Sequence, residues 1–295
     1  MSVIVKITTY ILFVIVVGSL IAPPLYAAGQ WAIETDLLPQ LKGFRFPKYL
    51  NRGVLVAALI GLWPFLKSIG VSDFAGMGLE TNARWRRDLL LGLAVGMAGL
   101  CCVALGLVFS GRLEVKAVIV PWWFVSAAAT AVTVALLEEF FFRGALFGVL
   151  LRQLRPVTAG LWLSLIFAAL HFIKPHPSVK LWEGEIHWWT GFDVLSYSFW
   201  QFLEPRLLIG GLVTLFTVGA VLAYVTFRTR SLFMAIGIHA GWVFVLRLVQ
   251  MGTTRLRGPD WLVGQPLITG LVPFGMVAIT GLLMVGILRK REAVS

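Results

Sequence analysis

Charge is scarce in this chain of 295 residues, of which 13% are charged and 59% are hydrophobic. A soluble domain carries about a quarter charged residues, so this composition excludes an ordinary soluble globular protein. It also excludes an intrinsically disordered chain, because disordered chains are poor in apolar residues. Cysteine is equally scarce. Cys101 and Cys102 are adjacent within an apolar run, which is the spacing of neither a disulfide framework nor a thiolate metal site.

The charge that is present is mostly basic: 25 Lys and Arg face 14 Asp and Glu, for a formal net charge of +11. These residues form short clusters between long apolar runs and never gather into one basic face, so we expect no nucleic-acid partner. Lys and Arg beside apolar runs are typical of the flanks of membrane-spanning helices. The lipid bilayer is therefore the first predicted partner.

The apolar runs predict an all-α fold, a polytopic bundle of transmembrane helices in a single membrane domain over residues 1–295. A span needs roughly 20 predominantly apolar residues. No organelle-targeting segment is apparent, so we expect an integral, multi-pass protein of a bacterial inner membrane. About eight spans are predicted, at residues 7–28, 53–66, 89–110, 118–142, 159–173, 207–227, 232–249 and 266–288.

The longest polar connection between these spans runs from Lys174 to Pro205. It mixes charged residues, Glu183 among them, with four tryptophans. Aromatic rings of this kind sit at the level of the lipid headgroups. We therefore expect a loop or short helix that lies at the membrane interface. The tryptophans are Trp182, Trp188, Trp189 and Trp200.

Three charged residues lie in or directly after the apolar run at 118–142. Glu138 and Glu139 are within it, and Arg143 follows it. An acidic residue at the centre of a spanning helix costs roughly 2.5–3.5 kcal/mol on insertion scales, so a pair of them requires a partner or a function. Glu139 and Arg143 are four residues apart, which places them on one helix face with the acid on the favourable N-terminal side. Glu138 points about 100° away and has no local cation. A purely structural ion cluster near the headgroups is the alternative interpretation.

Two of the four histidines fall within or beside other apolar runs: His171 follows Phe167 by four residues, and His239 lies between two glycines. A single intramembrane histidine most often makes a hydrogen bond between helices. Two of them, together with an acidic pair on a third span, favour a converging polar site. We expect Glu138, His171 and His239 to face one cavity.

These positions resemble the signature of the CAAX-protease and bacteriocin-processing family, also called the ABI family. The similarity rests on Glu138-Glu139-x-x-x-Arg143, Phe167-x-x-x-His171 and His239 in this order, and covers about residues 118–250. The resemblance implies an all-helical intramembrane protease. It implies that Glu138 acts as general base with His171, that Glu139 and Arg143 form a structural brace, and that His239 stabilises the oxyanion.

One residue departs from the pattern of the eukaryotic-type members, which have an Asn four residues after the third-motif histidine. This chain has Val243 there, and valine donates no hydrogen bond. Loss of one oxyanion donor slows turnover by ~10²–10³ without abolishing it. The indole N–H of Trp242, on the neighbouring turn, is an alternative donor, although a packing role is the more usual one for such a residue.

A zinc ion is the alternative to a metal-free mechanism, and no other cofactor is expected. Glu138, His171 and His239 could supply three ligands and leave a position for water. Against zinc, no helix carries His-Glu-x-x-His. We favour activation of water by Glu138 and His171 without a metal.

The predicted function is that of an intramembrane endopeptidase acting on a membrane-associated peptide or protein, with a glutamic-type mechanism favoured and a metalloprotease as the alternative. The substrate can be lipidated or unmodified, because a site of this kind suits both. Two other functions remain open: a non-catalytic membrane scaffold or immunity factor, and a proton-coupled transporter that uses intramembrane Glu and His as a relay. The halves of the chain show no matching hydropathy, which disfavours common transporter plans.

Overall fold

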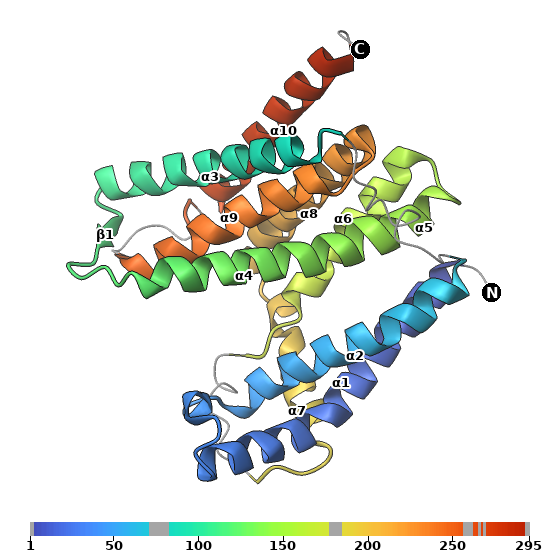
Figure 1. Ribbon diagram of the computed structural model, residues 1–295, viewed down its shortest axis with the longest axis vertical. Coiled ribbons are helices and arrows are strands. Elements are labelled where there is room, and N and C mark those ends of the chain that lie inside the picture. The colour runs from blue at the N-terminus through green and yellow to red at the C-terminus, as the bar shows by residue number, and fades with distance from the viewer. Residues whose placement is uncertain are drawn as a thin grey trace. The chain divides into compact units, whose positions relative to one another are not determined.

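The computed structural model describes residues 3–70, 83–176, 185–255, 262–264, 267 and 270–292. Trp182 and Glu183 of the predicted interfacial segment lie outside these residues. The described elements are α1 (Val3–Glu34), η1 (Pro39–Leu41), α2 (Phe46–Ser68), α3 (Trp85–Phe109), β1 (Leu113–Val115), α4 (Trp122–Glu139), the π-helical η3 (Phe140–Phe147), α5 (Gly148–Leu151), α6 (Pro156–Phe172), α7 (Thr190–Ser196), η5 (Tyr197–Leu203), α8 (Pro205–Thr229), α9 (Phe233–Gly252), β2 (Thr253–Arg255) and α10 (Leu271–Glu292) (Figure 1).

The all-α prediction is confirmed. Apart from the short antiparallel pair β1–β2, the regular elements in the described ranges are helices. Six helices are long and apolar enough to cross a membrane, and they match six of the predicted spans. The predicted spans at 118–142 and 159–173 are helical too. These two helices are not among the six. Glu138 and Glu139 reduce the mean hydropathy of α4, and α6 is short, with 17 residues.

The chain divides into two compact units, one from residues 1–72 and 172–204, the other from 73–171 and 205–295. In the first unit α1 and α2 pack side by side, and α7 packs on α1 (Figure 1). Both prolines inside α1, Pro23 and Pro24, are tolerated as they are in membrane helices. The expectation of one membrane domain stays a prediction.

In the second unit α9 lies between α3 and α4 (Figure 1). Glycines allow α3 and α9 to touch along their backbones. A Cβ atom at Gly92 or Gly96 of α3 would meet backbone atoms of Met234 or Ile238, and one at Gly241 of α9 would lie 2.7 Å from the Leu93 carbonyl oxygen. Close contact through small residues is the usual way membrane helices associate. It fixes the position of α9, the helix that carries His239.

Candidate functional site

The two glutamates lie where α4 ends and the helix continues as the π-helical segment η3. Glu138 and Glu139 are the last residues of α4, and Arg143 belongs to η3. The wider turn of a π-helix is rare in proteins, and where it occurs it is often at a functional site. One continuous helical segment therefore supplies all three charged residues, and the second unit contains the whole group.

Glu139 and Arg143 form a buried ion pair. Arg143 Nη1 donates to Glu139 Oε1 at 2.8 Å, and both side chains are fully buried. Arg143 Nη2 also approaches the Gly219 carbonyl oxygen of α8, at 3.5 Å. The i,i+4 spacing predicts this contact between the two side chains, whereas the approach to α8 has no counterpart in the sequence.

Phe167 of α6 connects the ion pair with His171. Its ring centre lies 4.6 Å from the Arg143 guanidinium and 4.2 Å from the centre of the His171 ring. Its carbonyl oxygen lies 2.8 Å from His171 Nδ1. Because a carbonyl oxygen only accepts hydrogen bonds, this contact places the proton of the neutral imidazole on Nδ1. His171 Nε2 is then the acceptor nitrogen.

Glu138 contacts both histidines with one oxygen. Its Oε2 atom lies 3.5 Å from His171 Nε2 and 3.9 Å from His239 Nε2. That oxygen is buried and makes no hydrogen bond to a described residue, although 27% of the side chain is exposed. The three helices α4, α6 and α9 thus bring Glu138, His171 and His239 together. A buried polar atom without a partner in a native fold calls for an explanation, and a bound water is a common one.

His239 is held by the second glutamate. Its Nδ1 atom lies 2.7 Å from Glu139 Oε1, the same oxygen that accepts from Arg143. A carboxylate accepts hydrogen bonds, so His239 Nδ1 is the donor and Nε2 is directed toward Glu138. The i,i+4 spacing predicts only the Arg143 partner of Glu139 and misses this contact, because spacing along one helix carries no information about a residue 100 positions away.

The side chain of Val243, one turn after His239 on α9, is in apolar surroundings. It packs with Ala131, Ala135 and Ala240, as expected of a valine in this place. Trp242 belongs to a different apolar cluster, with Leu222 and Met234 among its members, and its indole nitrogen is buried and has no hydrogen-bond partner among the described residues. Packing is thus the observed role of both residues.

Zinc is the alternative to a metal-free site. Within the described ranges, no three His, Cys, Asp or Glu side chains form a group that could hold a metal ion. The preference for a metal-free site stays a prediction. What Glu138, His171 and His239 share is one carboxylate oxygen beside two imidazole nitrogens.

Comparison with known proteins supplies the family. Residues 120–245 match the family model described as type II CAAX prenyl endopeptidase Rce1-like. This segment contains α4, α6 and the part of α9 that carries His239. It therefore includes every residue of the site. No curated protein and no solved structure matches the chain significantly. This family model belongs to the CAAX-protease and bacteriocin-processing family, to which residues 120–245 of the chain are therefore similar.

Proposed function

We propose that this protein is an intramembrane endopeptidase that hydrolyses a peptide bond of a membrane-associated polypeptide with a water activated by Glu138 and His171. The observation that carries the proposal is the 3.5 Å approach of His171 Nε2 to Glu138 Oε2. Both atoms are hydrogen-bond acceptors when Glu138 is ionised and His171 is neutral. A water that donates to both is held and polarised between them, as general-base catalysis requires.

Proton transfer follows from the same geometry. Glu138 takes a proton as the water oxygen attacks the scissile carbonyl, and the Glu138–His171 pair returns a proton to the leaving amine. The hydrogen bond from His171 Nδ1 to the Phe167 carbonyl oxygen keeps Nε2 directed at Glu138 throughout. The 27% exposure of the Glu138 side chain and 25% of His171 leave the pair accessible to water and substrate.

His239 is proposed to stabilise the oxyanion of the tetrahedral intermediate. Its Nδ1 proton is engaged by Glu139, so donation to the oxyanion requires a second proton, on Nε2. Glu139 supports this state because its negative charge lies against the ring. Arg143 in turn donates to Glu139, which supports the structural role proposed for this pair.

The substrate is proposed to be a membrane-anchored peptide or protein, lipidated or not, and the location a bacterial inner membrane. Water activation is proposed to need no metal. These proposals rest on the family match and on the six apolar helices long enough to cross a membrane.

The decisive experiment compares cleavage by three purified proteins: wild type, Glu138→Gln, and Glu114→Gln as a matched control, since Glu114 is an exposed acid of β1 outside the site. Each is reconstituted in liposomes with a membrane proteome, and new peptide termini are identified by mass spectrometry. Glu138→Gln should lose ~10²–10⁴ in rate while remaining folded, and Glu114→Gln should not. Wild-type rates in Glu138→Gln, or no product of the wild type, would contradict the proposal.

A further inference from the structure

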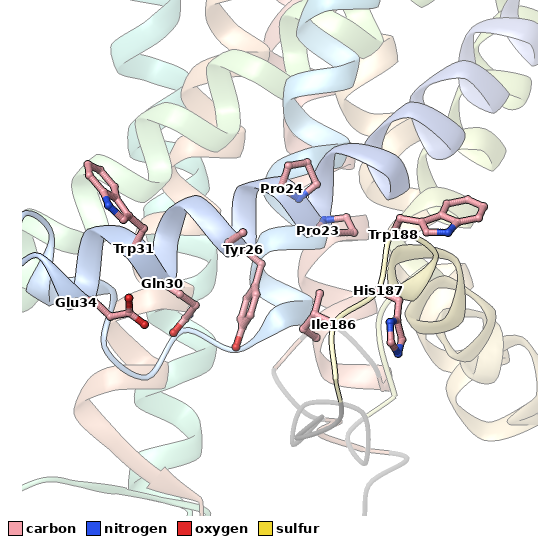
Figure 2. Close-up of a pocket in the computed structure, with 10 residues that line it drawn as sticks. Pro23, Pro24, Tyr26, Gln30, Trp31, Glu34, Ile186, His187 and Trp188 are labelled. Carbon is pink, nitrogen blue, oxygen red and sulfur yellow. The ribbon is translucent and has the colours of Figure 1, made fainter.

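A groove of about 590 Å³ lies in the first unit, and none of the residues that line it belongs to the proteolytic site. One wall is the last part of α1, and the other is the segment that precedes α7 (Figure 2). Its volume falls within the range of about 300–1,000 Å³ typical of small-molecule sites. The side chains that matter to its chemistry are Tyr26, Gln30, Trp31, Glu34, Ile186 and Trp188.

One end of the groove is polar, and the other is mainly apolar, with His187 as its one titratable lining residue. Figure 2 shows Gln30, Trp31 and Glu34 at one end, and Pro23 and Ile186 at the other. At a rise of 1.5 Å per residue, the eleven steps from Pro23 to Glu34 span about 16 Å along α1. Residues 7–22 contain no charged residue, so the Pro23 end is nearer the hydrocarbon and the Glu34 end nearer water. A phospholipid in a bilayer is arranged in the same way, with its polar headgroup near water and its apolar acyl chains in the hydrocarbon.

The polar end carries a single formal charge, and it is negative. Glu34 is exposed and forms no ion pair with any described residue, and the Gln30 amide makes no hydrogen bond there either. The Trp31 ring, three residues earlier on α1, also lines the groove and is 59% exposed. A carboxylate and the face of a tryptophan ring both attract an ammonium group. The amide of Gln30 offers donors to a phosphate oxygen.

We propose that this groove binds a phospholipid with an ammonium-bearing headgroup. The ammonium lies beside Glu34 and Trp31, and an acyl chain follows Pro23 and Ile186 toward the hydrocarbon. Trp188, which also lines the groove and is 67% exposed, offers further apolar surface to the acyl chain. The site is independent of the proposed peptidase activity, since none of its residues belongs to the catalytic group.

The test is native mass spectrometry of the full chain released from nanodiscs that contain equal amounts of phosphatidylethanolamine and phosphatidylglycerol. We expect one phosphatidylethanolamine to be retained per chain in preference to phosphatidylglycerol. Glu34→Gln and Trp31→Ala should each weaken its retention roughly threefold to tenfold. Glu204→Gln and Trp63→Ala are matched controls, because they alter an exposed acid and an exposed tryptophan of the same unit outside the groove, and they should leave retention unchanged.

Three outcomes would overturn the proposal. Equal retention of both lipids would show that the ammonium is not recognised. Unchanged retention in Glu34→Gln would move the site elsewhere on the protein. Displacement of the lipid by millimolar ethanolamine or tetramethylammonium would assign the groove to a soluble ammonium compound instead of a lipid.

Discussion

His239 Nδ1 and Arg143 Nη1 both contact Glu139 Oε1, at 2.7 Å and 2.8 Å. One buried carboxylate oxygen thus joins α9 to the segment that follows α4. Glu139 and Arg143 are fully buried and His239 is 6% exposed, so water does little to screen the charges of this group. The stability of the second unit should therefore depend on Glu139 more than on either of its partners.

Glu139→Ala should be more destabilising than Arg143→Ala. The first leaves a buried guanidinium without its carboxylate, a change that typically costs about 3–5 kcal/mol. The second leaves Glu139 with the His239 donor, so we expect a smaller loss. Thermal unfolding in detergent measures both, with the exposed Glu114→Ala as a control that should change the unfolding free energy by about 0.5 kcal/mol or less.

The double variant Glu139→Ala/Arg143→Ala provides a check on the cause. If the losses come from unpaired buried charge, the double variant should be more stable than the sum of the single losses predicts. Additive losses, or a larger effect of Arg143→Ala than of Glu139→Ala, would contradict the central position of Glu139.

Hydropathy and helical spacing predict much of this site and fold, and their failures have a common cause. Apolar runs identify the spanning helices because the bilayer imposes their length. The i,i+4 rule places Glu139 beside Arg143 because both belong to one helical segment. The contact of His239 with Glu139 and the backbone contact of α3 with α9 depend on packing between helices distant in sequence. The π-helical turn after Glu139 likewise has no signal in the spacing of residues.

Gly96→Ala should displace α9 and reduce both stability and peptidase activity. A Cβ atom there would collide with the backbone of Ile238, the neighbour of His239. Overpacking of this kind typically costs about 1–3 kcal/mol. Gly106→Ala is the matched control on the same helix, where an added Cβ meets no atom within 4 Å. Because alanine is the better helix former, Gly106→Ala should stabilise by about 0.5–1 kcal/mol.

Melting temperature and cleavage rate, measured on the same preparations, distinguish the two glycines. Equal melting temperatures in Gly96→Ala and Gly106→Ala would mean that α3 and α9 can separate without cost. A destabilised Gly96→Ala with an unchanged cleavage rate would show that the position of His239 does not depend on this contact.

Removal of metal should leave the peptidase activity largely intact. If Glu138 and His171 activate the water directly, no ion is needed to bring the pKa of a bound water to about 7. Exhaustive chelation followed by a cleavage assay tests this, and elemental analysis of the purified protein should find far less than one zinc per chain. Stoichiometric zinc, with activity that disappears on chelation and returns on zinc addition, would replace the proposed mechanism and leave the protease assignment standing.

Val243→Asn should raise kcat with little change in KM. The substitution puts an amide donor one helical turn after His239, where the eukaryotic-type members have Asn, and an oxyanion donor acts mainly on the transition state. Because Val243 packs with Ala131 and Ala135, we expect a gain of at most about tenfold, well below the ~10²–10³ lost when an established donor is removed. The amide should also cost about 1–3 kcal/mol of stability, since it replaces an apolar side chain in apolar surroundings. Val243→Leu is the control, because leucine has nearly the shape of asparagine and no hydrogen-bond donor. A lower kcat in a folded Val243→Asn protein, or the same gain in Val243→Leu, would show that this position does not face the oxyanion.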